Sequence, residues 1–165
     1  MHEEYFFKKY YGFLMGIGRS YVKSEELAQE IVQDSFLKFF DSVDKLEQNP
    51  IILPWLRRIA VNTAIDYYRK NQKFKLHEEA DGNRLLVEQE NAIEQLGYQE
   101  IIALLEQLPD DQQLIFNLYE VEGYSHKEIA EKLSISESSS RVYLTRAKHK
   151  LRQLIHLHYT VYAGR

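Results

Sequence analysis

The chain has 165 residues, of which 44% are hydrophobic and 28% charged, and its formal net charge at pH 7 is -4. This composition is typical of folded globular proteins and excludes wholesale disorder. Cysteine is absent, which excludes a disulfide framework, a thiolate metal site and a cysteine nucleophile. Because no apolar run could span a bilayer and the N-terminus is acidic rather than signal-like, we expect a cytoplasmic protein.

Charge is segregated along the chain. Residues 54–73 carry five basic side chains against the single acid Asp66, and residues 138–152 carry five basic side chains and no acid. Between these segments, residues 71–107 hold eight acids and three bases. A net negative charge by itself argues against nucleic-acid binding. Two local basic segments separated by an acidic connector nevertheless indicate that each segment could bind nucleic acid.

The first part of the chain shows helical periodicity and no sustained alternation typical of strands. A first helix is predicted over residues 3–21 and a third over residues 54–70. The second begins at Ser24, a favoured N-cap residue, ahead of an apolar stripe that reaches Phe40. Together these elements predict one bundle with an aromatic-rich core over residues 1–71.

The apolar pattern lapses over residues 72–92, a polar and acidic stretch that predicts a flexible linker. Helical periodicity returns over residues 93–107 and again from Asp110, whose spacing from a glutamine three residues on resembles a capping box. The sequence thus predicts an all-α fold of two small domains. The first is a bundle of three to four helices over residues 1–71, and the second is a helix-turn-helix domain over residues 93–165.

The helix-turn-helix is the strongest local signal. Ser125 and Glu128 form a capping box that opens a short helix ending at Leu133. A tight turn over residues 134–136 follows, and then a long basic helix over residues 137–158. The turn begins with serine where glycine is usual, and a left-handed backbone there costs about 1 kcal/mol. A capped helix, a short turn and a longer basic helix are the parts of a helix-turn-helix.

Apolar residues of the last helix fall on one stripe at 100° per residue, and a different set faces away from it. The candidate DNA-reading residues on or beside that outer side are Ser138, Arg141, Val142, Thr145 and Arg146, and Ser139 joins Ser138 at the helix N-terminus. Arginine can pair with guanine edges in the major groove, and a helix N-terminus can hold a phosphate. The alternative is an ordinary helical hairpin with a solvated face, which would usually interleave acids with the basic residues.

A second basic surface is predicted on the third helix. Its candidate residues are Arg57, Arg58, Asn62, Asp66, Arg69 and Lys70. Basic side chains flanked by aromatics and one amide suit a nucleic-acid strand, where the amide could read an unstacked base. A basic face on an ordinary helical bundle explains this pattern equally well.

Three ordered blocks of sequence, over residues 26–38, 55–70 and 108–147, resemble the successive blocks of extracytoplasmic-function (ECF) sigma factors, minimal sigma-70-type subunits of bacterial RNA polymerase. The resemblance implies a region-two domain for the polymerase clamp and the minus-10 element, a linker, and a region-four domain for the minus-35 element. One departure is the run of serines at 138–140, where many relatives carry Gly-Thr-Val.

The resemblance also implies partners and roles for individual residues. Asn62 would line the pocket for a flipped minus-10 base, and the loop over residues 47–53 would shape that pocket. Core RNA polymerase, promoter DNA and an anti-sigma factor are the implied partners, and the acidic linker would thread the polymerase. The residues implied to bind the polymerase are Gln33, Asp34, Phe36, Leu37 and Lys38. For Phe36, an ordinary core position is the alternative.

Two other classes of function stay open at this stage. The first is a two-domain helix-turn-helix transcription regulator that does not act through core polymerase. The second is a protein-interaction adaptor with a degenerate helix-turn-helix. The sequence has no glycine-rich phosphate loop and no carboxylate–histidine cluster at metal-ligand spacing, so we expect no enzyme, cofactor, metal site or small-molecule substrate.

Overall fold

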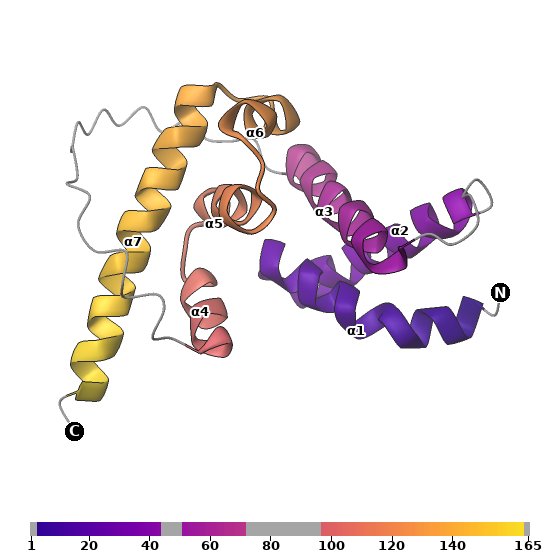
Figure 1. Ribbon diagram of the computed structural model, residues 1–165, viewed down its shortest axis with the longest axis horizontal. Helices are drawn as coiled ribbons and strands as arrows, with labels where there is room; N and C mark the ends of the chain where they lie inside the picture. Colours follow the sequence, from indigo (N-terminus) through magenta and orange to yellow (C-terminus); the bar gives the residue numbers. More distant parts are fainter. Residues whose placement is uncertain (1–2, 44–50, 72–96, 164–165) are drawn as a thin grey trace. The chain divides into compact units, whose positions relative to one another are not determined.

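The computed structural model of the protein describes residues 3–43, 51–71 and 97–163. Within these ranges the chain forms seven α-helices, one short π-helical turn and no strand, so the predicted all-α fold is confirmed. The chain divides into two compact units, Met1–Lys73 and Phe74–Arg165 (Figure 1). The linker predicted over residues 72–92 lies outside the described residues, and its bounds stay a prediction.

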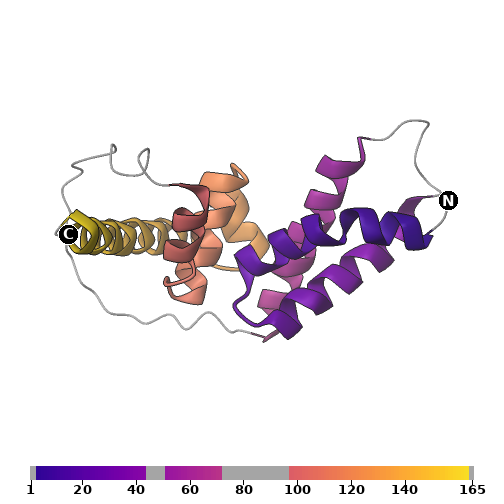
Figure 2. The ribbon, with the colours of Figure 1, turned by 90° about the horizontal axis from the view of Figure 1, so that it is seen from below.

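In the first unit, the residues that the structure describes form three helices: α1 (Glu3–Tyr21), α2 (Glu25–Val43) and α3 (Ile52–Asn71). Figure 2 shows α1 and α2 side by side, and α3 packs against both. Ser24 begins α2 as predicted, because its Oγ accepts a hydrogen bond from the backbone N–H of Leu27 at 3.3 Å. Helix α3 begins two residues before Pro54. A first-turn N–H has no partner within the helix, so proline is tolerated there.

The core of the first unit is rich in aromatic rings, as predicted. Phe6 stacks on Phe39 with 4.4 Å between ring centroids, and Phe39 also meets Trp55 at 4.7 Å. Gly18 lets α1 approach α2 closely, since a Cβ atom at this position would lie 3.2 Å from the carbonyl oxygen of Ala28. This packing holds α2 and α3 side by side and leaves one face of each helix on the surface.

The described residues of the second unit form four α-helices and a π-helical turn. These elements are α4 (Tyr98–Leu105), α5 (Asp110–Phe116), η2 (Asn117–Val121), α6 (His126–Leu133) and α7 (Glu137–Ala163). The capping box predicted at Asp110 is wrong. The N-cap of α5 is Pro109, with no side-chain cap, and the glutamine expected to complete the box, Gln113, is buried at 2% exposure. The predicted end of α7 near residue 158 is also short of the observed end, five residues later.

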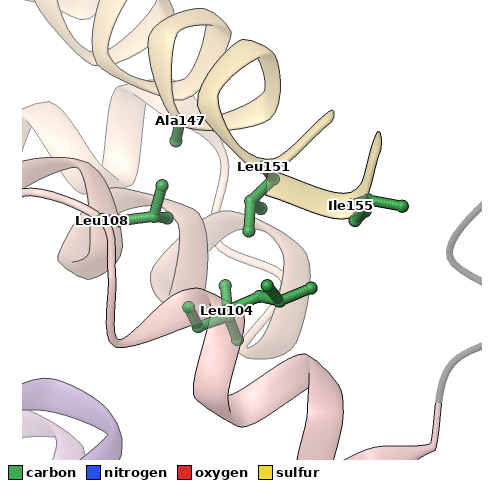
Figure 3. Packing of buried hydrophobic residues seen from close by; sticks show 6 residues of the cluster. Leu104, Leu108, Ala147, Leu151 and Ile155 are labelled. Carbon is green, nitrogen blue, oxygen red and sulfur yellow. The ribbon is translucent and has the colours of Figure 1, made fainter. Parts of the chain in front are cut away.

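One side of α7 is fixed by a hydrophobic cluster (Figure 3). Leu104 and Leu108 meet Ala147, Leu151 and Ile155, which follow one stripe of α7. Each of these side chains is at most 6% exposed. This packing confirms the inward stripe predicted from the periodicity and sets which side of α7 faces outward.

Candidate nucleic-acid interface

The predicted capping box at the start of α6 is confirmed. The Ser125 Oγ accepts a hydrogen bond from the backbone N–H of Glu128 at 3.2 Å, and the backbone N–H of Ser125 donates to Glu128 Oε2 at 2.7 Å. These backbone and side-chain bonds to Ser125 lower the pKa of the Glu128 carboxyl. Two N–H groups that a helix cannot pair internally are thereby satisfied, which fixes where α6 begins.

The turn between α6 and α7 contains a left-handed residue at the position where the sequence has serine in place of the usual glycine. Ser134 has φ 55° and ψ 45°, and the backbone N–H of Ile135 donates to the carbonyl of Ala130 at 3.1 Å. A left-handed serine costs about 1 kcal/mol relative to glycine. The fully buried Ile129 and the nearly buried Leu133 hold α6 in the unit and fix the direction in which the chain enters α7.

Hydroxyl groups gather at the first turn of α7. Ser136 caps this helix, because its Oγ accepts a hydrogen bond from the backbone N–H of Ser139 at 3.0 Å. The same oxygen lies 3.0 Å from the Oγ of Ser138 and 2.8 Å from the Oγ of Ser139. The hydroxyls of both predicted DNA-reading serines are therefore engaged with the cap of their own helix.

A histidine joins α6 to α7, and sequence reasoning missed this contact. The Nδ1 atom of His126 lies 2.9 Å from the Oγ of Ser140, which is fully buried, and the ring stacks on Tyr119 at 4.5 Å. Burial lowers the pKa of His126, and the positive charges of Arg141 and Lys148 lower it further. A neutral imidazole at this position pins the first turn of α6 to α7.

The face of α7 predicted to read DNA lies on the surface. Ser138, Arg141, Val142 and Thr145 are exposed, whereas Ser139 and Arg146 are half-buried. Arg141 pairs with Glu137 at 3.2 Å along the helix. The hydroxyl of Thr145 donates to the carbonyl of Arg141 at 2.9 Å. The structure therefore brings all six predicted residues onto the first three turns of one helix.

The basic face of α3 is also on the surface. Arg58, Asp66, Arg69 and Lys70 are exposed, and Arg57 and Asn62 are half-buried. Asp66 is not isolated among these basic side chains, because the Nζ of Lys38 on α2 lies 3.4 Å from its Oδ2. The same Nζ donates to the Oγ1 of Thr63 at 3.1 Å. This face therefore carries its negative charge next to a positive one from the neighbouring helix.

Of the predicted polymerase-binding residues on α2, four are exposed and one is buried. Gln33, Asp34, Leu37 and Lys38 are exposed, with Leu37 at 63%. Phe36 is only 3% exposed because its ring packs against Phe7, with 4.7 Å between ring centroids. Phe36 is therefore a core residue of the first unit, whereas the other four side chains lie on its surface.

Part of the predicted minus-10 pocket falls outside the described residues. The loop over residues 47–53 is described only from Ile51 onward, and Ile51 and Leu53 are 78% and 47% exposed. Among the described residues, no group of three or more histidine, aspartate or glutamate side chains is placed to hold a metal ion. In the same part of the chain, no helix is both long enough and apolar enough to cross a membrane.

The fold and its surfaces define a helix-turn-helix protein with a second helical unit. Residues 6–74 match Sigma-70 region 2, and residues 98–151 match Sigma-70, region 4. The chain is 30% identical over 133 residues to the RNA polymerase sigma factor SigV of Bacillus subtilis (strain 168), covering 81% of this chain and 78% of SigV. The chain therefore belongs to the sigma-70 family of RNA polymerase sigma factors.

Further comparisons agree. The chain is 26% identical over 137 residues to the ECF RNA polymerase sigma factor SigM of Bacillus subtilis (strain 168), covering 82% of this chain and 83% of SigM. A solved structure of the sigma factor RpoE with the anti-sigma factor NepR from Bartonella quintana matches with TM-score 0.51 at 20% identity, covering 92% of this chain and 95% of RpoE. That likeness shows the shared fold. The protein is an ECF sigma factor, which directs promoter-specific transcription and belongs to a class of non-enzymatic initiation factors.

Proposed function

We propose that this sigma factor acts in the cytoplasm and uses three surfaces. The α2 surface, Gln33, Asp34, Leu37 and Lys38, binds core RNA polymerase, α3 captures the minus-10 element, and α7 reads the minus-35 element. The observation that carries the proposal is the arrangement of α7. Its inner stripe is packed against Leu104 and Leu108, while its outer side is exposed at Arg141 and Thr145 and has no acid over residues 138–152.

On α7, the chemistry suits the major groove of duplex DNA. The guanidinium groups of Arg141 and Arg146 can donate paired hydrogen bonds to guanine or to phosphate oxygens. The position of the helix is fixed by the buried Ile129 and by the contact between His126 and Ser140, so the side chains of α7 enter the groove as a set.

On α3, the chemistry suits a separated strand. Asn62 is half-buried between exposed basic positions at Arg58 and Arg69, so its amide sits within a cationic face and can donate to and accept from a base edge. Taking a base out of its stack costs a few kcal/mol, which such contacts can offset. We assign Asn62 to base capture and the surrounding basic residues to the strand backbone.

On α2, one apolar side chain stands out among polar neighbours. Leu37 is 63% exposed between Asp34 and Lys38, so covering it with a protein partner would remove its apolar side chain from water. We assign this surface to core polymerase. An anti-sigma factor is a further proposed partner, because the related RpoE was solved bound to one.

The polymerase contact can be tested by gel filtration with core RNA polymerase. The chain should co-elute stoichiometrically, and Leu37→Asp should weaken binding tenfold or more, since one buried leucine contributes about 1.5–3 kcal/mol. Leu157→Asp is the matched control, because Leu157 is 60% exposed and lies outside the three proposed surfaces. If the chain does not co-elute with polymerase but binds a promoter duplex tightly by itself, it acts instead as a repressor- or activator-type regulator.

A further inference from the structure

Three residues form a central row on the outer face of α7. Ser138, Val142 and Thr145 follow one another at spacings of four and three residues, so they line up along one side of the helix. Arg141 and Arg146 lie on either side of this row. Val142 is 47% exposed even though it is apolar, and Thr145 is exposed as well.

The hydrogen-bonding groups in this row are already engaged within the helix. The hydroxyl of Thr145 donates its single hydrogen to the carbonyl of Arg141 at 2.9 Å, so toward a partner this side chain offers its methyl group and no hydrogen-bond donor. The Oγ of Ser138 lies 3.0 Å from the Oγ of Ser136 in the helix cap. Val142 has no polar side-chain atom. The centre of the face therefore offers methyl groups, and the charged donors lie only at its flanks.

In the major groove, thymine presents a methyl group on C5 beside its O4 acceptor, whereas the other three bases carry no methyl group on that edge. We propose that Val142 and Thr145 read thymine methyl groups at one or two positions of the minus-35 element. This proposal rests on the proposed function of α7. It makes Val142 a specificity-determining residue, with Arg141 and Arg146 anchoring the helix beside it.

The test removes single methyl groups from the DNA and leaves the protein unchanged. Core polymerase reconstituted with the full chain first selects its promoter from a randomised library in run-off transcription. Each thymine of the minus-35 element is then replaced in turn by uracil, which differs only in lacking the methyl group. We expect one or two positions at which transcription falls about three- to fivefold, the loss that corresponds to one buried methyl group.

A variant series shows whether Val142 reads the methyl group. Val142→Ser should lower transcription from the thymine template, and it should lose the response to uracil at one position. Val121→Ser is the matched control, because Val121 is 54% exposed on η2 and should keep the full response. Thermal unfolding should be the same for both variants, since both side chains are on the surface.

Two results would overturn the proposal. The first leaves the proposed function of α7 intact, and the second contradicts that function as well. If uracil has no effect at any position while Arg141→Ala still weakens use of the minus-35 element, methyl reading is wrong and the proposed function of α7 stands. If neither uracil nor Arg141→Ala changes promoter use, α7 does not read the element, and both proposals fail.

Discussion

The Nζ of Lys38 on α2 lies 3.4 Å from the Oδ2 of Asp66 on α3 and 3.1 Å from the Oγ1 of Thr63. The surface proposed for the polymerase and the surface proposed for the minus-10 strand therefore share one ion pair. Both charged side chains are about half exposed, at 48% and 50%, so the pair stabilises the fold by only about 0.2–1 kcal/mol. Its larger effect is to neutralise the single acid within the basic segment 54–73.

Lys38→Ala should therefore impair promoter opening, because it leaves the carboxylate of Asp66 uncompensated beside an incoming DNA strand. Repulsion at a partly exposed site should lower open-complex formation on the order of fivefold. Permanganate reactivity of unpaired thymines measures the effect. The double variant Lys38→Ala with Asp66→Asn should recover most of the loss. A double variant as defective as the single one would mean that Lys38 acts by touching the polymerase instead.

Arg141→Ala and Arg146→Ala should each weaken use of the minus-35 element while leaving polymerase binding intact. A paired contact from arginine to a base contributes about 1–3 kcal/mol, so run-off transcription should fall about tenfold or more. A loss confined to one base position indicates base reading, whereas a uniform loss across sequences indicates a phosphate contact. An unchanged promoter profile in both variants would show that α7 does not contact the minus-35 element.

Glycines on α1 should respond to substitution in opposite directions. Gly12 and Gly16 are exposed within the helix, and a Cβ atom at either would meet nothing within 4 Å. Because alanine favours a helix over glycine by about 1 kcal/mol, Gly12→Ala and Gly16→Ala should each stabilise the protein by about that amount. Gly18→Ala should destabilise it, since the added atom would lie 3.2 Å from the carbonyl oxygen of Ala28. Urea unfolding of the three variants tests this contrast.

The helix-turn-helix should be less stable in mild acid. The folded state lowers the pKa of His126 from the ordinary 6.5, because burial and the charges of Arg141 and Lys148 disfavour the imidazolium, although Glu137 favours it. A lowered pKa means that the unfolded chain binds the proton more readily. The contribution to stability is therefore complete above about pH 6.5 and is lost as the pH falls through the folded pKa. Urea unfolding at pH 7.5 and 5.5 measures the loss.

Two variants isolate the histidine in that experiment. His126→Gln should reduce the pH dependence, because its amide can still reach Ser140 without titrating in this range. His156→Gln should leave the dependence unchanged, since His156 is exposed on α7 beyond the helix-turn-helix. Equal pH dependence in all three proteins would show that His126 does not carry the effect.

Asn62→Ala should impair promoter opening more than recruitment, because its amide acts on a base only after that base leaves the stack. Losing these hydrogen bonds should cost about 1–3 kcal/mol and weaken discrimination at one minus-10 position. A template with the minus-10 bases already unpaired should recover much of the activity but not the base preference. Poor folding or poor polymerase binding by the variant would instead make Asn62 a structural residue of the bundle.

Helix placement could be predicted from the sequence where local chemistry decides it. Ser125 and Glu128 form the capping box that their spacing indicates, because both side chains are on the surface and reach their own backbone. The same spacing failed at Asp110. That helix has Pro109, one residue earlier, as its N-cap, and the side chain of Gln113 is buried in the core. Tertiary packing overrode the local pattern.

In the candidate site, too, local sequence patterns predicted some features, whereas contacts between helices decided others. Periodicity alone placed Val142 and Thr145 on the outer side of α7, since the buried stripe fixes the opposite side. It also placed Phe36 on the apolar stripe of α2, but only the packing against Phe7 of α1 shows that this ring belongs to the core and not to the surface. It also could not pair Lys38 with Asp66, which lie far apart in the sequence. Contacts between helices depend on how the bundle packs, and a single sequence does not encode that in a local pattern.

The measurement closest to the central claim is run-off transcription from a randomised promoter library by core RNA polymerase, with and without this chain. With the chain, we expect start sites that share a minus-35 and a minus-10 element at constant spacing, whereas core polymerase alone should show no such preference. The free chain should bind the selected duplex weakly at about 150 mM salt, since its net charge is -4. No promoter preference with the chain, or tight specific binding without polymerase, would contradict the account.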